Sequence, residues 1–525
     1  MSQRLHLFGG ASLLILYLVA LCSLWPLSTR DIWMSPDEAA TAAFARSYSE
    51  TGQFTLPEPL NLPAGGLLGA RSMVARGADL VPGGFLGLPW LAGTLHALFG
   101  EVILGLMGPL LAVIGVLAWG DIWRRLVSLR FGALAATALA IHPAWLLYAA
   151  RPLMPNVPFV SLALVSLWAL ISKPKSPGFA GLAGLCLALS LAIRLSEAIW
   201  LLPLAAGLLW TFRARLSVNS LAALLTGFLL GMGALLGFQA GTYGAAVGTG
   251  YTSAPVVIGS LAPAAPALQS SLLGLLFPFG FHEWSIVRHA WHYGLALQWW
   301  WSAAAVFGAV ILLRQAYLKP WKPEWPLVTL VATLLIAAWL AAVYGSWTFF
   351  DNPDPRLVTL GNSYARYFLP AFVGASVMVA TGLDWLWARA GRGAAICLLT
   401  ILTVLSFQLV IFGPDGWLHS LRVLDTGLLK RAGVLSHTPA DAIIITDRSD
   451  KYLLGYRDHL LVPLRDDSTY QALPDLAQLA PLYYFGLTLP PVDIAHLESR
   501  YLAPVGLYLS PITTLDDETL YHIHF

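Results

Sequence analysis

Two adjacent carboxylates, Asp37 and Glu38, follow Pro36 in the segment 30–40. A carboxylate held about 2.6–3.2 Å from a hydroxyl can accept its proton during an attack, so the pair suits general-base catalysis or cation binding. The same residues also suit the first turn of a helix, where proline is tolerated and acidic side chains interact favourably with the helix dipole. The residues alone leave both interpretations open.

Arginine side chains are the candidate phosphate ligands, because the planar guanidinium can bind two phosphate oxygens at once. Arg366 lies between Tyr364 and Tyr367 where an apolar run begins, Arg151 ends another run, and Arg194 interrupts a third. A charge in an apolar run needs a partner or a ligand. Glu197 could supply that partner for Arg194 within one helix. The alternative for each arginine is pairing with an outer acid or contact with lipid headgroups.

Aromatic side chains beside histidine and arginine occur at 277–293, which includes His282 and Arg288. Such a group suits stacking on a sugar and contact with a phosphate, and it equally suits the aromatic belt of a membrane interface. Asp351 and Asp354 could bind a divalent cation, although two carboxylates in a proline-rich stretch more commonly form a turn. Cys22, Cys186 and Cys397 all lie in apolar runs, so we predict neither a disulfide framework nor a His/Cys metal site.

The composition places these residues in a membrane protein. Of the 525 residues, 57% are hydrophobic and 11% are charged, and the mean hydropathy is +0.69. A soluble domain is typically about 25% charged. These values exclude a disordered chain, a nucleic-acid-binding protein and an ordinary cytosolic enzyme. The net charge of +2 implies no bulk electrostatic partner.

The apolar stretches predict about eleven transmembrane helices, since a helix needs about 20 apolar residues to cross a bilayer. We interpret the first as an uncleaved anchor, because no A-x-A cleavage site follows it. The predicted spans are 7–27, 102–122, 132–150, 156–172, 178–194, 196–212, 219–240, 295–314, 326–345, 367–386 and 393–412.

The short basic segments predict the orientation, because cytoplasmic loops are rich in Lys and Arg. Eleven spans with a cytoplasmic N-terminus place all six basic segments inside, and the C-terminus then lies outside. These segments carry Arg4; Arg124, Arg125 and Arg130; Lys173 and Lys175; Arg213 and Arg215; Arg314, Lys319 and Lys322; and Arg389 and Arg392. The basic residues of the membrane portion outside these segments are all arginine: Arg30, Arg46, Arg71, Arg76, Arg151, Arg194, Arg288, Arg356 and Arg366.

Two insertions, 28–101 and 241–294, and the end of the chain are expected on the outer face. Residues 415–525 hold half of the acidic residues and lack long apolar runs. The segments 442–446 and 459–463 predict buried strands, and 473–480 predicts a short helix. We therefore expect two domains: a transmembrane domain, 1–414, and a small extracytoplasmic α/β accessory domain, 415–525. We expect the polar residues 447–451 to form a solvated turn.

The first outer loop resembles that of the GT-C glycosyltransferases. The resemblance rests on Asp37-Glu38, an amphipathic helix at 39–50, Thr51-Gly52, and then Pro57 and Asn61. It is closest to the protein O-mannosyltransferases and the lipid A aminoarabinose transferase, glycosyltransferase families 39 and 83. Three further segments, 99–101, 150–156 and 363–370, agree with it in the same order, so that it covers roughly residues 1–410.

This resemblance implies a GT-C-like membrane enzyme that moves a sugar from a polyprenyl-phosphate donor to a hydroxyl on the outer face, with inversion. By resemblance Asp37 acts at the acceptor hydroxyl and Glu38 is its partner. The resemblance implies no specific cofactor and leaves open whether a divalent cation takes part. The acceptor is a protein, a lipid or a glycan, the other partners are membrane lipids rather than nucleic acid, and the location is a prokaryotic inner or plasma membrane. The expected donor-phosphate ligands are Arg366, Arg151, Arg194 and Arg288, and the expected substrate-binding residues are His282, Tyr364, Tyr367 and Arg71.

The segment after Asn61 departs from the aminoarabinose transferase pattern, which has Lys-Pro-Pro-Leu there. This chain instead has Gly65-Gly66, then 71–73 and 80–85. The changed segment is expected near the sugar and the acceptor, so the identity of the sugar does not follow from the resemblance.

Two other classes of function remain as alternatives. A transporter or flippase of a lipid-linked sugar should carry ionisable groups at mid-membrane and show matching halves. Here charges cluster at the ends of the spans and no internal repeat is found, which favours an enzyme. The third alternative is an assembly protein whose outer domain binds partners, for which 483–485 offers an unspecific aromatic patch.

Overall fold

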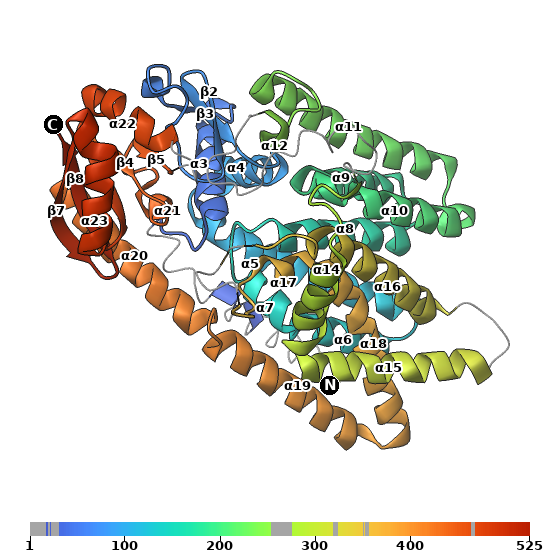
Figure 1. The fold of residues 1–525 in the computed structure, drawn as a ribbon. Helices are drawn as coiled ribbons and strands as arrows, with labels where there is room; N and C mark the ends of the chain where they lie inside the picture. The colour runs from blue at the N-terminus through green and yellow to red at the C-terminus, as the bar shows by residue number, and fades with distance from the viewer. Residues whose placement is uncertain are drawn as a thin grey trace. The chain divides into compact units, whose positions relative to one another are not determined.

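The computed structural model describes residues 17–18, 21–22, 31–253, 276–318, 324–349, 351, 356–463 and 468–525. The chain divides into two compact units (Figure 1). Unit 1 comprises Met1–Leu24, Leu106–Ala234 and Ala265–His419, and unit 2 comprises Trp25–Gly105, Leu235–Ala264 and Ser420–Phe525. Nearly all of the predicted span 7–27 lies outside the described residues, as do Arg4, Arg30, Lys319, Lys322 and Asp354.

The predicted apolar spans after the first are helical, with ends within a few residues of the expected positions. By length and composition, the described residues contain seven helices able to cross a membrane, or eight if a bent pair is one span. Two further apolar helices, α8 and α9, are shorter, so the total of eleven stays a prediction. The helices are α5 (Val102–Leu126), α6 (Leu129–Ala140), α7 (Pro143–Ala149), α8 (Asn156–Ser172), α9 (Pro177–Ile193), α10 (Ala198–Phe212), α11 (Val218–Tyr243), α15 (Trp299–Leu318), α16 (Trp325–Tyr344), α18 (Leu369–Arg389) and α19 (Arg392–Phe412).

One predicted span, 132–150, is broken. Helices α6 and α7 meet at an angle of 66° across a short break, and Pro143 is the first residue of α7. Proline lacks a backbone N–H and its ring clashes with the preceding turn, so it begins a helix readily but does not continue one. The predicted span is therefore a bent pair of helices, which stays a prediction as one membrane crossing, and α7 leads into the turn that holds Arg151.

Helix α18 forms the centre of unit 1, where it packs against α6, α15, α16 and α19. Small residues allow the close approaches. A Cβ atom added at Gly308 of α15 would lie 1.7 Å from the carbonyl oxygen of Met378, and one at Gly374 of α18 would lie 2.0 Å from Oγ1 of Thr333. Helices in membranes associate through such contacts, because lipid leaves little hydrophobic driving force between them.

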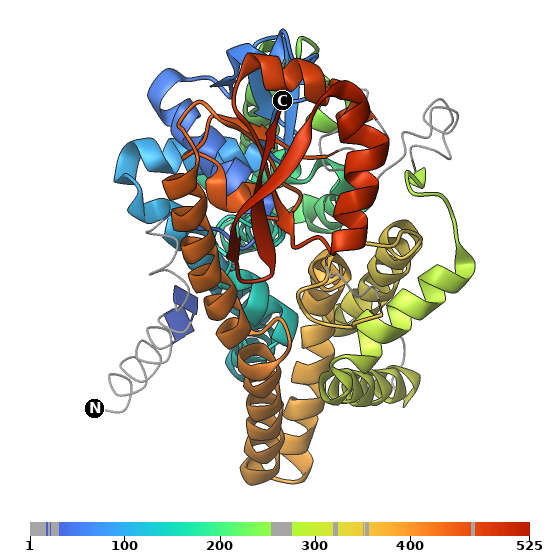
Figure 2. The ribbon, with the colours of Figure 1, turned by 60° about the vertical axis from the view of Figure 1, so that its left-hand side comes forward.

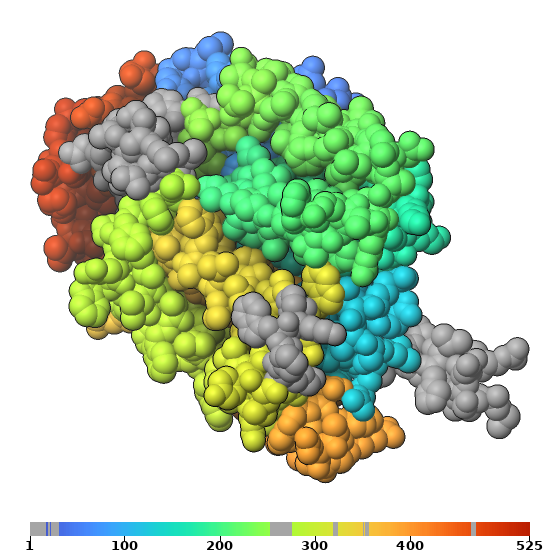
Figure 3. Space-filling model, turned by 90° about the vertical axis from the view of Figure 1, so that its right-hand side faces the viewer, coloured from blue at the N-terminus to red at the C-terminus, as the bar shows by residue number. Residues whose placement is uncertain are grey.

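The outer sides of α10, α15 and α16 expose large apolar side chains, including Trp210, Val306, Val310, Leu334 and Leu335. Figure 3 shows the face on which these green and yellow segments reach the surface. Exposed apolar side chains of this size are unfavourable in water and are expected where a helix contacts lipid.

Unit 2 begins with the predicted first outer loop. The helix expected at 39–50 is α3 (Pro36–Thr51), which Ser35 caps and which ends at Gly52 with a left-handed φ of 74°. A three-stranded antiparallel sheet follows, in the order β1-β3-β2. Its elements and those beside it are β1 (Leu56–Pro57), η2 (Pro59–Asn61), β2 (Met73–Arg76), β3 (Asp79–Pro82), α4 (Gly87–Phe99) and α12 (Gly250–Ser253).

The C-terminal part of unit 2 contains a five-stranded sheet in the order β5-β4-β6-β8-β7, with helices packed around it (Figure 2). Strand β4 runs parallel to β5 and β6, whereas β8 is antiparallel to β6 and β7. The predicted strands at 442–446 and 459–463 are confirmed as β4 and β5, and the helix predicted at 473–480 begins earlier, as α22. The elements are α20 (Trp417–His437), β4 (Ile443–Ile445), α21 (Asp450–Leu453), β5 (His459–Leu461), α22 (Ser468–Leu479), β6 (Leu482–Leu487), α23 (Pro491–Leu497), β7 (Tyr508–Leu515) and β8 (Glu518–His524).

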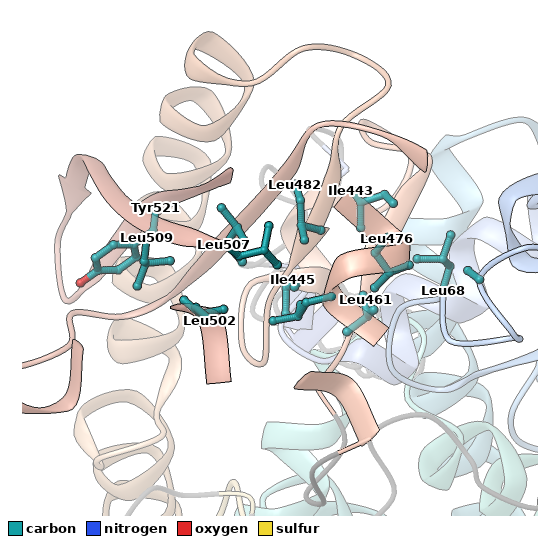
Figure 4. Packing of buried hydrophobic residues seen from close by; sticks show 13 residues of the cluster. Leu68, Ile443, Ile445, Leu461, Leu476, Leu482, Leu502, Leu507, Leu509 and Tyr521 are labelled. Carbon is teal, nitrogen blue, oxygen red and sulfur yellow. The ribbon is translucent and has the colours of Figure 1, made fainter. Parts of the chain in front are cut away.

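The core of this sheet includes residues of the first outer loop. Ala64 and Leu68 are buried in one cluster with Ile443, Ile445 and Leu461 (Figure 4). The side chain of Asn61 holds this turn by hydrogen bonds to both backbone groups of Leu68, at 2.8 and 3.0 Å. Residues 60–70 and the C-terminal sheet therefore share a hydrophobic core. A separate domain made of residues 415–525 alone stays a prediction.

Candidate functional site

Glu38 completes a capping box at the start of α3. Its carboxylate accepts hydrogen bonds from the backbone N–H and the hydroxyl of Ser35, at 3.1 and 3.2 Å, and the Ser35 hydroxyl in turn accepts the N–H of Glu38. The side chain is buried. Such a box satisfies backbone donors that a helix N-terminus otherwise leaves unpaired. For Glu38 the capping interpretation holds, and the cap fixes the backbone that carries Asp37.

Asp37 points towards the strand hairpin of the same loop. Its Oδ1 accepts a hydrogen bond of 2.6 Å from the hydroxyl of Ser72, and the residue is partly exposed. Ser72 has a φ of 65°, a left-handed conformation that is rare for a residue other than glycine. Such conformations cluster at functional sites, where the surrounding structure enforces them. Asp37 is thus a reachable carboxylate in a fixed position, as a general base requires.

Ser72 is held by the end of the hairpin. Its carbonyl oxygen accepts the N–H of Gly83 at 2.8 Å. A Cβ atom added at Gly83 would lie 2.8 Å from the carbonyl carbon of Ser72, so only glycine fits there. The sequence marked Ser72 only as part of a segment that departs from the family pattern. Its contact with Asp37 had no signal in the sequence.

Arg71 is engaged within the protein. Its backbone N–H donates to Asp450 Oδ2 at 2.8 Å, and its Nε and Nη2 donate to the same carboxylate at 2.5–3.1 Å. Burial alone would lower the pKa of Arg71, but the nearby carboxylates of Asp450, Asp447 and Asp37 raise it, so the side chain stays charged. Asp450 is fully buried. The expectation of a solvated turn was therefore wrong for Asp450, and the predicted role of Arg71 in substrate binding competes with this ion pair.

In unit 1 the segments 150–156 and 363–370, which carry Arg151 and Arg366, lie next to each other. The hydroxyl of Tyr148 donates to the carbonyl oxygens of Leu360 and Asn362, at 2.9 and 3.1 Å. Asn156 Nδ2 donates to the carbonyl oxygen of Arg366 at 3.1 Å. The turn that carries Arg151 thus packs against α17 (Ser363–Tyr367), which carries Arg366.

Arg151 is 7% exposed, and its guanidinium lies over the ring of Tyr148, 5.4 Å from the ring centroid. Its Nε has no hydrogen-bond partner among the described residues. A buried cation without an anion is costly, so this side chain is suited to an anionic ligand.

Arg366 donates from Nη2 to the Ser363 hydroxyl at 2.8 Å. The same hydroxyl and the Ser363 N–H donate to Asp351, at 3.1 and 2.7 Å. The sequence suggested Asp351 as a cation ligand. In the structure its carboxylate instead accepts hydrogen bonds from Ser363, the first residue of α17, and is linked through Ser363 to Arg366.

Arg194 has an internal anion. Its Nε and Nη2 donate to Glu197 Oε1 at 3.1 and 2.7 Å, and Nη2 also donates to the hydroxyl of Tyr344 at 2.8 Å. The guanidinium stacks over Tyr367, 4.7 Å from the ring centroid. The pairing with Glu197, left open by the sequence, is therefore present, and Arg194 is a weaker candidate for a phosphate ligand than Arg151 or Arg366.

The remaining predicted residues lie around α14 (Glu283–His289) and η5 (Ala290–Ala296). Arg288 is exposed and lines a small cavity of about 20 Å³ together with His289, His292, Tyr293 and Tyr364, room for about one water molecule. Tyr364 is buried and stacks on His289, with 4.1 Å between the ring centroids, and burial lowers the pKa of His289.

His282 and Tyr367 lie outside this cavity lining. His282 is exposed, and its backbone N–H donates to the Ser346 hydroxyl at 3.2 Å. Tyr367 stacks on Tyr344, with 4.2 Å between the ring centroids. Among the described residues, no group of three or more His, Cys, Asp or Glu side chains is arranged to hold a metal ion.

Comparison with known proteins shows the fold. No protein-family model and no curated protein matches the chain. Two crystal structures of ArnT from Cupriavidus metallidurans match it over 99% of this chain and 98% of that chain. The structure bound to undecaprenyl phosphate has 12% identity and a TM-score of 0.56, and the apo structure has 11% identity and a TM-score of 0.57. ArnT is a lipid A aminoarabinose transferase of the GT-C superfamily, so the predicted GT-C-like fold, a polytopic helical membrane protein with a C-terminal sheet domain, is confirmed.

Proposed function

We propose that this chain is a membrane glycosyltransferase that moves a sugar from a polyprenyl-phosphate donor to an acceptor hydroxyl on the extracytoplasmic face, with inversion. The observation that carries the proposal is the fixed, partly exposed carboxylate of Asp37, which accepts a hydrogen bond from Ser72. It stands in a chain that shares its fold, end to end, with a protein crystallised with undecaprenyl phosphate.

In the proposed reaction the acceptor oxygen attacks the anomeric carbon while its proton passes to Asp37. The bond from the anomeric carbon to the phosphate oxygen breaks, and its electron pair leaves with the lipid phosphate. Negative charge therefore develops on the phosphate in the transition state, where a prearranged cation is most effective. Arg151, Arg366 and Arg288 are the candidates for that cation, and Glu38 acts by holding the backbone of Asp37.

The proposed location is a prokaryotic inner or plasma membrane, with the N-terminus in the cytoplasm and both outer insertions and the C-terminal sheet outside. The basic segments between the apolar helices support this orientation. It places Asp37 on the face where a lipid-linked sugar presents its head to an acceptor.

The test uses purified protein in liposomes with a panel of radiolabelled undecaprenyl-phosphate sugars, and membrane extract of the source cells as acceptor. The expected result is transfer of label by the wild type and its loss in Asp37→Asn. Asp79→Asn is the matched control, because Asp79 is an exposed acid of the same loop. Transfer that is equally fast in Asp37→Asn would refute the role of the carboxylate.

The same liposomes test the flippase alternative. A flippase moves the labelled lipid between leaflets without forming a labelled product, whereas the proposed enzyme forms product from donor already in the outer leaflet. Mass spectra of glycans and lipids from a deletion strain then identify the sugar and the acceptor, which the sequence does not specify.

A further inference from the structure

The loop that carries Asp37 is bound to the C-terminal part of unit 2 at its backbone. Lys451 Nζ donates to the carbonyl oxygen of Met34 at 2.7 Å. Arg431 Nη1 donates to the carbonyl oxygen of Asp31 at 3.1 Å. Between these points Ile32 is buried in a cluster with Leu424 and Tyr452. The backbone that enters α3 is thus fixed by residues some 400 positions later in the chain.

A second connection reaches Asp37 from the side of the hairpin. Asp450 accepts hydrogen bonds from both the backbone N–H and the guanidinium of Arg71. Arg71 Nη2 also donates to the carbonyl oxygen of Arg448, at 2.9 Å. Because both the backbone N–H and the guanidinium of Arg71 are held, the residue directly before Ser72 has little freedom. The carboxylate of Asp450 therefore helps to hold Ser72 in its left-handed conformation, from which its hydroxyl reaches Asp37.

Asp450 is in turn part of a buried polar network. The hydroxyl of the neighbouring Ser449 donates to Glu518 Oε2 at 2.7 Å. Lys430 Nζ lies 2.8 Å from the same Glu518 oxygen and 2.5 Å from Asp517 Oδ1. Glu518 belongs to β8 and Lys430 to α20, so the C-terminal sheet and its long helix both fix the turn that bears Asp450.

We propose that Asp450 is a positioning residue for Asp37, acting through Arg71 and the hydroxyl of Ser72. The C-terminal region would then be more than an accessory domain, because it would set the geometry of the proposed base. This inference rests on the proposed function in one respect, the role of Asp37 as the base, and its structural part is independent of any activity.

The first experiment measures kcat and donor KM for transfer from the radiolabelled undecaprenyl-phosphate sugar that the wild type uses. Arg71→Gln and Asp450→Asn are expected to lower kcat by about 10²-fold, the effect of a misplaced catalytic group, with little change in donor KM. Arg71→Lys keeps the charge but loses the second donor, so it should restore only part of kcat. Arg457→Gln is the matched control, because that guanidinium binds Leu435 and Thr438 of the same C-terminal region.

A double-mutant cycle separates positioning from a general structural role. In a Ser72→Ala background, Arg71→Gln and Asp450→Asn are expected to cost little further kcat, because the hydroxyl that they position is already absent. If each change lowers kcat by the same factor in that background as in the wild type, Arg71 and Asp450 act independently of Ser72. The proposed positioning of Asp37 through Ser72 would then be wrong.

The second experiment needs no substrate. Hydrogen exchange of the full-length protein in detergent should increase at residues 31–38 and 71–75 in both Arg71→Gln and Asp450→Asn. In Arg457→Gln it should increase only near 435–438. Unchanged exchange at 31–38 and 71–75 would overturn the inference. Loss of turnover in Asp37→Asn without coupling to Asp450 would overturn only this inference, whereas normal turnover in Asp37→Asn would overturn the proposed function.

Discussion

The hydroxyl of Ser72 donates a hydrogen bond of 2.6 Å to the carboxylate of Asp37, from a backbone whose φ is 65°. The conformation is unfavourable for serine, so the surrounding contacts must maintain it. The two residues come from different elements, a helix start and a hairpin. Their contact joins the segment that resembles the GT-C family to the segment that departs from it.

Replacing Asp37 tests the proposed base directly. Asp37→Asn should lower turnover by about 10²–10⁴-fold, the usual contribution of a general base, because the amide cannot take the acceptor proton. The change is nearly isosteric, and the amide oxygen can still accept from Ser72, so the melting temperature should stay close to that of the wild type. The measurement is single-turnover transfer together with thermal unfolding in detergent. A large fall in melting temperature would mean that the lost turnover reports misfolding.

Replacing Ser72 separates stability from activity. Glycine adopts a positive φ without strain, whereas a left-handed conformation costs about 1–2 kcal/mol for other residues. Ser72→Gly should therefore be more stable than Ser72→Ala by about 1 kcal/mol, although both lack the hydroxyl and both should lose turnover. Thermal unfolding and kcat of the two variants check this. Equal stability of the two would show that the backbone strain at this position is small.

The apolar helices could be predicted from the sequence because length and hydropathy alone determine a membrane span. The strands β4 and β5 were found for a similar reason, since each is a short run of buried aliphatic residues. Helix α20 was missed, because its apolar residues cover only one side and its mean hydropathy resembles that of a loop. Strands β6, β7 and β8 were missed for other reasons. β6 is a short aromatic run that contains Gly486, β7 contains Pro511, and β8 carries His522 and His524 among its apolar residues.

Part of the candidate site could be predicted from the sequence and part could not. Segments 150–156 and 363–370 were selected separately by resemblance, and the structure brings them together through Asn156 and Arg366. The ion pair between Arg71 and Asp450 spans 379 positions and leaves no local pattern in the sequence. A positive φ at Ser72 could not be foreseen, because the residue that usually signals it, glycine, is absent there.

The ion pairs of Lys430 predict acid sensitivity in the C-terminal part of unit 2. The hydrogen bond from Lys430 lowers the pKa of Asp517. A carboxylate whose pKa is lowered on folding stabilises the fold above its unfolded pKa of about 3.9, and this contribution is lost as the pH falls through the folded value. The melting temperature of Lys430→Met should therefore be well below that of the wild type at pH 7 and closer to it at pH 3. A difference that is the same at both pH values would contradict this account.

Two arginines of unit 1, Arg194 and Arg151, should respond differently to mutation. Arg194 pairs with the buried Glu197, so Arg194→Ala should destabilise the protein by about 3–5 kcal/mol, because it leaves a buried carboxylate unpaired. Arg151 has an Nε without a hydrogen-bond partner in the described part of the chain, and Arg151→Ala should leave stability nearly unchanged while it raises donor KM. Thermal unfolding without donor, compared with kinetics at varied donor concentration, distinguishes the two kinds of arginine.

Arg366 is expected to act on the leaving phosphate. It is linked through Ser363 to Asp351, an arrangement that a competing phosphate could replace. Arg366→Ala should raise donor KM and lower kcat, because charge develops on the phosphate in the transition state. Arg366→Lys should recover only part of both, since lysine keeps the charge but cannot bind two oxygens in one plane. Donor KM and kcat for the wild type and both variants are the measurement. If both variants keep wild-type values, Arg366 is an interfacial anchor, and Arg151 or Arg288 becomes the better candidate for the phosphate ligand.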